Sequence, residues 1–367
     1  HFQDNNKIKP DFGDLINPAV FQKHFDEQKK KSEAATPHAE ILQQLIEQFE
    51  PLDFEALANP HGAEGFKLNS KHFLILSIEN TLLIAEKNRW GLCKNQDYIY
   101  LYNGTFWKEL EKGAFQKFLG EAAEKMGVAK FSARFYQFRE QLFKQFLETA
   151  YLPTPENDKD RVLINLQNGT YEISPQGTKL RPFDRTDFIT YQLPFEYNPQ
   201  AKAPIFEAYL NRVLPDIERQ RLLAEYLGYV FIKHESRLKL EAAMILYGTG
   251  ANGKSVFFEI VNALLGKQNT SSYSLQELTD VSGYYRAMIA NKLVNYASEI
   301  NGKLQADMFK RMASGEMIPA RLPYSEPMQL TQYAKFIFNC NELPKDVEHT
   351  PAYFRRWVII PFDVTIP

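Results

Sequence analysis

The segment from Leu240 to Gly266, LEAAMILYGTGANGKSVFFEIVNALLG, constrains the fold more than any other part of the chain. It begins with an apolar run, passes through a glycine-rich loop, and continues with apolar residues at helical spacing. This order predicts a buried strand, a tight loop and a helix. The loop matches the pattern G-x-x-x-x-G-K-[ST], which holds the phosphates of a nucleoside triphosphate in that structural context. The residues predicted to contact the nucleotide are Gly248, Thr249, Gly250, Ala251, Asn252, Gly253, Lys254, Ser255 and Val256.

The chemistry of phosphate binding accounts for the residue types in this loop. The glycines allow backbone N–H groups to turn towards the phosphates, where a side chain would block the approach. Lys254 places a positive charge on the β and γ oxygens, and the hydroxyl of Ser255 can bind Mg²⁺. The helix that follows directs the positive end of its dipole at the same anion. The loop therefore predicts a nucleoside triphosphate, with ATP as the expected cofactor, together with Mg²⁺.

Two later apolar runs end in polar residues that would complete a hydrolytic site. In NKLVNYASEI a predicted strand ends near Glu299, whose carboxylate would bind Mg²⁺ together with Ser255. The alternative is that Glu299 is a surface residue or the cap of the next helix. In AKFIFNCNELP a predicted strand ends at Asn341, which would orient the attacking water against the γ-phosphate. The alternative for Asn341 is a turn residue before Pro344.

Two adjacent arginines precede the last apolar run, in PAYFRRWVIIPF. One of them would act as an arginine finger, a planar charge that neutralises the γ-phosphate as it leaves. Arg355 and Arg356 point in different directions on any regular backbone, so one of the two is expected to reach a given phosphate. We favour Arg356 for this role. The alternative is that the pair anchors the following strand through surface ion pairs.

The apolar runs AAMILYG, KLVNYASE and AKFIFNCNE share one pattern, since each is apolar and ends in a polar residue. Such runs, alternating with helical segments, are typical of an α/β fold with buried parallel strands. Composition shifts divide the rest of the chain: a polar lead-in ends at EQKKKSEAATP, and prolines cluster at PFEYNPQAKAP. We expect a linker and short helix at 1–60, partly flexible, an α+β accessory or collar domain at 61–200, a helical lead-in at 201–237 and a phosphate-loop ATPase domain at 238–367. Hairpin turns are expected at Asn103-Gly104 and Asn168-Gly169, and Asp216 is expected to cap a helix.

Composition excludes several classes of protein. The 367 residues carry a net charge of -2, so nucleic-acid binding would need a local basic patch or a ring that concentrates charge in a channel. Cys93 and Cys340 cannot form a disulfide framework, which favours a reducing cytoplasm. The histidines are scattered, and no structural zinc site is expected. No run is long enough to span a membrane, and the start without Met suggests a fragment of a longer protein.

Taken together, the motifs resemble superfamily 3 helicases, in particular the poxvirus-like and phage or plasmid primase-helicase branch. The resemblance spans about residues 206–362 and is carried by YGTGANGKSVF, LVNYASE, FKRMASGEMIPAR, FIFNCNELP and FRRWVIIPF, in this order. It implies an AAA+-like ATPase that forms a ring, expected to be a hexamer, and moves along single-stranded or forked DNA. ATP would bind between subunits, with an arginine supplied by the neighbour. The resemblance also implies a primase module N-terminal to this segment, and the cytoplasm of a bacterial host or a virus-infected cell as location.

The family moves DNA with a hairpin between the strand that ends in Glu and the strand that ends in Asn. Here that stretch reads GEMIPARLPYSEPMQL, and it lacks the lysine that the family usually carries at the hairpin tip. Arg321 would contact phosphate, Tyr324 would stack on a base or pack on a sugar, and Lys310 is a further candidate contact. The alternative is that Pro323 and Pro327 simply stiffen a turn.

The leading hypothesis is an ATP-driven DNA helicase that acts in the replication of a phage, plasmid or mobile element. The alternative from a different class is an oligomeric switch that binds ATP and DNA to recruit or load partners with little unwinding. A packaging or defence ATPase with the same core is a weaker third option. We retain the hypothesis of an oligomeric switch because the hairpin sequence lacks the lysine that the family usually carries at its tip.

Overall fold

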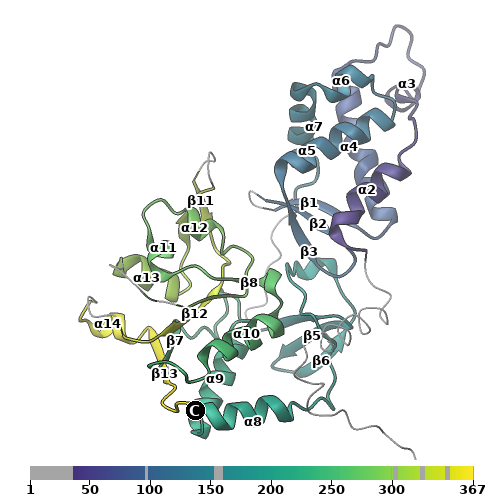
Figure 1. Cartoon of the computed structure of the whole chain (residues 1–367). Helices are drawn as coiled ribbons and strands as arrows, with labels where there is room; N and C mark the ends of the chain where they lie inside the picture. Colours follow the sequence, from purple (N-terminus) through teal and green to yellow (C-terminus); the bar gives the residue numbers. More distant parts are fainter. Residues whose placement is uncertain are drawn as a thin grey trace, which may run out of the picture.

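The computed structural model describes residues 36–95, 98–152, 160–298, 300, 305–322, 327–343 and 348–366 (Figure 1). Helices α2–α7 gather at one end of the molecule, and the parallel sheet with its helices forms the other end. The described chain is thus a mixed α/β protein, as the sequence predicts. Among the described residues, no helix is both long enough and apolar enough to cross a lipid bilayer.

The N-terminal helices share one hydrophobic core. Helix α2 buries Ile41 and Leu45 against this core, so the segment before residue 60 packs with the helices that follow it. The side chain of Asn69 caps α4 in a capping box with His72, which satisfies backbone groups at the helix start. The stretch from Phe115 to Ala150 is mostly helical and is divided among three helices. The elements are α2 (His38–Gln48), α3 (Phe54–Ala58), α4 (Ser70–Lys87), α5 (Lys112–Lys125), α6 (Lys130–Arg134) and α7 (Tyr136–Thr149).

Two small antiparallel sheets contain the predicted hairpins. In the first, the turn at Asn103-Gly104 is confirmed, because Asn103 Oδ1 accepts hydrogen bonds from the N–H groups of Thr105 and Phe106. In the second, the turn is one residue earlier than predicted, since Gly169 already pairs with Leu166. The sequence analysis did not anticipate β1 or β6. The strands are β1 (Gly91–Asn95), β2 (Tyr98–Tyr102) and β3 (Trp107–Leu110), then β4 (Val162–Leu166), β5 (Gly169–Ser174) and β6 (Gly177–Arg181).

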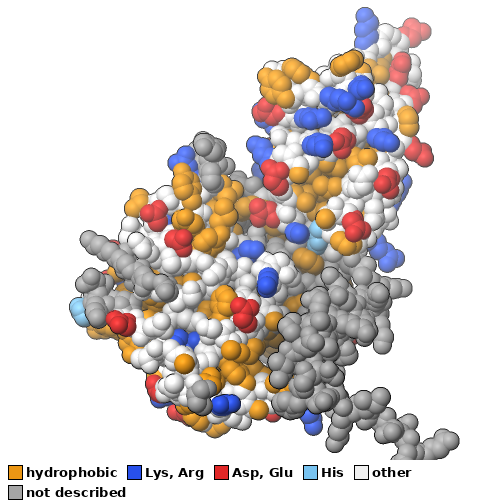
Figure 2. All heavy atoms as spheres, in the orientation of Figure 1, with side chains coloured by type: hydrophobic (Ala, Val, Ile, Leu, Met, Phe, Trp, Pro, Cys, Tyr) orange, Lys and Arg blue, Asp and Glu red, His pale blue; other side chains and the backbone are white. Residues whose placement is uncertain are grey.

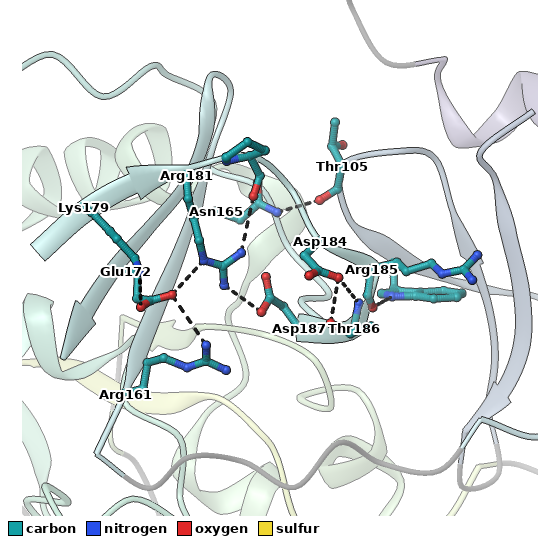
Figure 3. Close-up of polar contacts among 12 residues, drawn as sticks. Thr105, Arg161, Asn165, Glu172, Lys179, Arg181, Asp184, Arg185, Thr186 and Asp187 are labelled. Atoms are coloured by element: carbon teal, nitrogen blue, oxygen red, sulfur yellow. Dashed lines mark hydrogen bonds and ion pairs between the residues drawn. The ribbon is translucent and has the colours of Figure 1, made fainter.

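An ion-pair network joins the second small sheet to the short 3-10 helix η2 (Arg185–Asp187). Arg181 donates from Nε to Glu172 Oε2 and from a terminal nitrogen to Asp187 Oδ1, both at 2.7 Å (Figure 3). Glu172 and Asp187 are both buried, so each charge gains its partner where water is largely excluded. This network fixes η2 against the sheet.

Helices α8 (Pro204–Val213) and α9 (Ile217–Tyr229) form the predicted lead-in. Pro204 stands in the first turn of α8, where its missing N–H leaves no hydrogen bond unmade. The predicted cap of α9 is confirmed, because Asp216 Oδ1 accepts hydrogen bonds from the N–H groups of Glu218 and Arg219. Both helices pack on the parallel sheet that follows them.

The parallel sheet has the strand order β13-β7-β12-β9-β8. Successive residues of β7 point to opposite faces: Ala243 and Ile245 join one core cluster, and Met244 and Leu246 join the other. Helices therefore cover both faces, which explains why the strands read as unbroken apolar runs. The strands are β7 (Ala243–Tyr247), β8 (Thr270–Ser271), β9 (Val294–Ala297), β12 (Lys335–Cys340) and β13 (Trp357–Pro361).

The elements around the sheet include the expected hairpin. Strands β10 and β11 pair antiparallel between β9 and β12 in the chain, and residues 323–326 at its tip lie outside the described residues. The remaining elements are α10 (Lys254–Leu265), η3 (Lys267–Asn269), α11 (Leu275–Thr279), α12 (Tyr284–Ala287), α13 (Ala306–Ala313), β10 (Ile318–Ala320), β11 (Met328–Leu330) and α14 (Pro351–Phe354).

Candidate nucleotide-binding site

The glycine-rich loop lies between β7 and α10, at the carboxyl edge of the parallel sheet. Tyr247, the last residue of β7, is paired with Cys340, the last residue of β12. The N–H of Gly248 continues this pairing by donating to Cys340 O at 3.0 Å. The predicted order of strand, loop and helix is therefore confirmed, and the loop starts beside the end of the strand that leads to Asn341.

The loop requires glycine for two different reasons, a positive φ at some positions and close packing at another. Gly253 has a φ of +87° and Gly250 a φ of +117°, backbone conformations that a side chain opposes. A Cβ at Gly248 would lie 2.6 Å from Phe362 O, so this glycine is required by close packing. A Cβ at Gly250 would meet nothing within 4 Å, so the loop is open on that side.

Lys254 is held over the loop that it follows. Its side chain is buried, and Nζ donates to Gly248 O at 2.5 Å and to Asn252 Oδ1 at 3.0 Å. Burial lowers the pKa of Lys254 below its usual value. Ser255 and Val256 are exposed in the first turn of α10, as is Thr249 in the loop. A phosphate in the loop would replace neutral acceptors of Lys254 with a charged one.

Residues far away in the chain support the loop, and the sequence analysis missed them. Tyr209 on α8 donates its hydroxyl hydrogen to Gly253 O at 2.8 Å. After β13, the N–H of Ile366 donates to Ala251 O at 2.6 Å, and Phe362 O accepts from Asn252 Nδ2 at 3.2 Å. Without a motif of their own, these residues could not be identified before the fold was known.

The two predicted strand-tip residues differ in what the structure describes. Asn341 directly follows β12 and is exposed at the same edge as the loop. Glu299 lies outside the described residues, so its prediction as a Mg²⁺ ligand stays a prediction. Between their strands, Tyr296 donates its hydroxyl hydrogen to Asn339 Oδ1 at 2.8 Å, a buried contact that the sequence analysis did not anticipate. It ties β9 to β12 just below the predicted catalytic edge.

The arginine pair is divided between two environments. Arg356 donates from Nε to Ser314 Oγ at 3.0 Å and to Lys310 O at 3.2 Å, and from a terminal nitrogen to Ala352 O at 2.5 Å. These bonds tie it to α13 and α14 of its own chain. Arg355 is exposed; its backbone N–H donates to Pro351 O at 3.1 Å, but its side chain makes no hydrogen bond or ion pair with any described residue. Of the two guanidinium groups, the one of Arg356 is therefore held within the chain and the one of Arg355 lies at the surface; the prediction that one of them acts as an arginine finger stays a prediction.

The predicted DNA contacts also have different surroundings. Arg321 is exposed directly after β10, on the hairpin. Lys310 on α13 pairs with Asp307 at 2.8 Å and with Glu348 at 3.0 Å, and these hydrogen bonds raise its pKa. Its charge is thus neutralised within the chain, which weakens its assignment to DNA. Tyr324 lies outside the described residues.

No cluster of three or more His, Cys, Asp or Glu side chains that could hold a metal occurs in the part of the chain that the structure describes. Both cysteines are free and buried, and burial raises the pKa of Cys340. Cys340 therefore packs as a small hydrophobic residue.

Fold and site define the class: a mixed α/β protein with a phosphate-loop motif at the carboxyl edge of a parallel sheet. A family model described as "D5 N terminal like" matches residues 81–215, and a family of unknown function (DUF5906) matches residues 246–356. The chain is 25% identical over 241 residues to "Putative helicase L207/L206" of Acanthamoeba polyphaga mimivirus, covering 61% of this chain and 24% of that protein. It is 23% identical over 227 residues to "Putative helicase 121R" of Invertebrate iridescent virus 3, covering 56% and 23%. These matches support the expected resemblance to the D5-like primase-helicases of viruses and phages.

The chain spans about a quarter of the length of these viral relatives. Among solved structures, it is similar to the A form of the apo NrS-1 C-terminal region, with a TM-score of 0.48 and 13% identity. That likeness covers 79% of this chain and 61% of the other. A further apo structure of the NrS-1 C-terminal region has a TM-score of 0.46 and 12% identity, with 79% and 62% covered.

Proposed function

We propose that this chain is the motor region of an ATP-driven DNA helicase that acts in the replication of a virus, phage or other mobile element. The observation that carries the proposal is the loop Gly248–Ser255, placed between β7 and α10 beside the end of β12. Parallel α/β sheets bind their ligands at this edge, because loops and helix N-termini converge there. The helicase names of the viral relatives support the same activity.

In this proposal the loop residues hold ATP and Mg²⁺. The open side at Gly250 leaves room for the phosphates, and backbone N–H groups of the loop would bind them. Lys254 would exchange Gly248 O for a phosphate oxygen, and the exposed hydroxyl of Ser255 would bind Mg²⁺ together with Glu299. Asn341 would orient the attacking water from the neighbouring strand. Bound Mg²⁺ would neutralise charge on the phosphates.

We further propose that the chain works as an AAA+-like ring, expected to be a hexamer, with Arg355 entering the site of the next subunit. Exposed apolar side chains support an interface beside the hairpin: Val281, Met288 and Met317 are 80%, 43% and 52% exposed. Figure 2 shows hydrophobic side chains gathered over α12 and β11. Apolar patches of this kind mark interaction surfaces. Arg321 and the hairpin tip would face DNA. The proposal also includes a primase module N-terminal to this segment. The segment boundaries at residues 60, 200 and 237 remain proposals as well.

The test is ATP hydrolysis with and without single-stranded DNA, together with strand displacement on a forked duplex. Lys254→Ala should reduce both rates by about two orders of magnitude, because it removes the positive charge that stabilises the leaving phosphate. Lys267→Ala is the matched control: it also removes a lysine, from the exposed end of the same helix region, and should change neither rate. Normal turnover in Lys254→Ala would disprove the assignment of the loop.

The alternative is an oligomeric switch that binds ATP and DNA and loads partners. The ion pairs of Lys310 and the missing lysine in the hairpin sequence favour it, since both reduce the positive charge offered to DNA. Robust ATP hydrolysis without strand displacement, in particles that form complete rings, would support the switch.

A further inference from the structure

A cavity of about 190 Å³ lies at the amino edge of the parallel sheet. Lys335 is the first residue of β12 and Leu293 immediately precedes β9, so both lie at strand ends opposite to the phosphate loop. The other walls come from the β1–β3 sheet, from η2 and the residues after it, and from the chain that follows α9. No residue of Gly248–Val256 lines the cavity, so it is separate from the proposed ATP site.

Two buried donors of this cavity have no acceptor in the part of the chain that the structure describes. Lys335 is 4% exposed, and its Nζ forms no hydrogen bond with any residue the structure describes; neither does Nε2 of Gln332. Lys335 Nζ lies 4.7 Å from the ring centroid of Tyr229, and such a contact compensates for only part of the lost hydration. A buried ammonium and a buried amide without acceptors are costly unless a ligand or water satisfies them.

An acceptor stands on another wall. Asp187 is 8% exposed; Arg181 occupies Oδ1, while Oδ2 is buried without a partner among the residues in view (Figure 3). Because the network with Glu172 holds Arg181 in place, Oδ2 is fixed in position. It can accept a hydrogen bond from a hydroxyl or amino group.

His234 also lines the cavity, but its ring adds no charge. Nε2 lies 2.9 Å from Tyr333 O and therefore carries the hydrogen, and burial lowers the pKa of His234 to about 3. The free Nδ1 is directed at Gly315, where an added Cβ would lie 2.4 Å from it.

The charged groups that line the cavity are the cationic side chains of Arg161, Lys233, Lys292 and Lys335 and the anionic side chains of Asp187 and Glu235.

We propose that this cavity binds a small organic phosphate, with phosphate oxygens on Lys335 Nζ and Gln332 Nε2 and a hydroxyl or amino group on Asp187 Oδ2. The excess of cationic side chains favours an anion, and Tyr100, Phe188 and Tyr191 provide aromatic wall for an organic part. Burial lowers the pKa of Lys335 to about 7, and a bound phosphate would restore its charge. Ligand binding at this site would be coupled to contacts between the β1–β3 sheet and the parallel sheet of the proposed motor, because residues of both line the cavity.

The experiment uses the full chain with Lys254→Ala, which removes the main phosphate contact of the ATP site. Isothermal titration with AMP and, separately, with inorganic phosphate then measures binding elsewhere. Lys335→Met is added to remove the buried charge at nearly constant length. Lys239→Met is the matched control, because Lys239 is a nearby lysine that pairs with Glu241 and does not line the cavity. Thermal melting verifies that each variant is folded.

The proposal expects AMP binding in the Lys254→Ala protein, a loss of about ten-fold or more with added Lys335→Met, and a change below about three-fold with added Lys239→Met. Asp187→Asn should weaken AMP and leave inorganic phosphate unchanged. Equal affinity for AMP and inorganic phosphate would show that the anion alone is recognised and would overturn the assignment of Asp187. No binding in the Lys254→Ala protein, or unchanged binding after Lys335→Met, would mean that the cavity holds only water and would overturn the site itself.

Discussion

At the residue scale, burial of Lys335 makes its charged form unfavourable in the folded protein. Its pKa falls from 10.5 to about 7, first because of desolvation and then because Lys239 is near. The folded state therefore binds the proton more weakly than the unfolded chain does. The unfavourable contribution is complete below about pH 7 and disappears as the pH rises towards 10.5.

We therefore predict that Lys335→Met stabilises the protein most at low pH. The gain over the wild type should be larger at pH 7 than at pH 9 by about 2 kcal/mol, since each pH unit in this window changes the difference by up to about 1.4 kcal/mol. Thermal or urea unfolding at both pH values measures it. Lys239→Met should show only a smaller trend of the same sign, because Lys239 is the lesser cause of the lowered pKa of Lys335. An equal gain at both pH values would mean that Lys335 keeps its charge in the folded protein.

Arg355 and Arg356 should also separate by stability. Arg356→Ala removes hydrogen bonds to α13 and α14 and should destabilise the protein by about 1–3 kcal/mol. Arg355→Ala, at an exposed position, should change stability by about 0.5 kcal/mol or less while it abolishes ATP hydrolysis. Unfolding curves and steady-state ATPase rates of both variants distinguish a structural from a catalytic arginine. Full activity in Arg355→Ala would remove it as the finger.

At the scale of elements, α8 and the segment after β13 form a frame for the loop. Tyr209 on α8 holds Gly253 O, and Val213 lies 2.7 Å from where a Cβ at Gly253 would stand. The lead-in helix therefore restricts the backbone at the point where the loop becomes helix α10. An ATP site can be weakened from α8 without any change to the loop sequence.

We predict that Tyr209→Phe raises the KM for ATP by about two- to ten-fold, because the buried carbonyl of Gly253 loses its hydrogen bond and the loop is less well ordered. The kcat should change less. The control is Tyr136→Phe on α7, whose hydroxyl is exposed and distant from the loop. Steady-state kinetics with varied ATP measure the effect, and an unchanged KM would show that the loop does not depend on α8.

At the scale of the whole molecule, hydrogen bonds between described residues join the β1–β3 sheet to the region of the parallel sheet. Tyr98 donates its hydroxyl hydrogen to Met328 Sδ on β11 at 2.9 Å, and Asn291 Nδ2 donates to Tyr100 Oη at 3.0 Å. Met328 belongs to the hairpin that the proposal assigns to DNA. A movement of the hairpin would therefore displace residues of the β1–β3 sheet, so the N-terminal helices are physically connected to the parallel-sheet region that we propose as the motor.

We predict that inactive subunits restore activity when they are mixed. If Arg355 acts on the neighbour's nucleotide, a mixture of Lys254→Ala and Arg355→Ala subunits forms some interfaces with an intact loop and an intact arginine. In a random one-to-one mixture of rings this is roughly a quarter of the interfaces, because ring contacts are head to tail. ATPase rates across a titration of the two variants should pass through a maximum. A flat line near zero would assign the arginine to its own subunit.

Much of the site could be predicted because its signals are local. The loop Gly248–Ser255 requires glycines in a short sequence pattern, and β7, β9 and β12 are apolar because they are buried on both faces. Local sequence could not show that Arg356 is held within the chain, since its hydrogen-bond partners Lys310 and Ser314 come from a distant segment. The turn before Gly169 was misplaced by one residue because the register of a hairpin depends on its pairing partner.

The amino-acid sequence by itself determined the phosphate-loop motif, the alternation of strands and helices and the resemblance to viral helicases. These properties follow from side-chain type and spacing along the backbone. Only the tertiary structure decided which side chains are free to act: Lys310 and Arg356 are bound within the chain, the side chain of Arg355 is exposed, and Lys335 is buried without an acceptor among the described residues. The physical reason is that hydrogen-bond partners and access to water are supplied by segments distant in the sequence, so they exist only once the chain has folded.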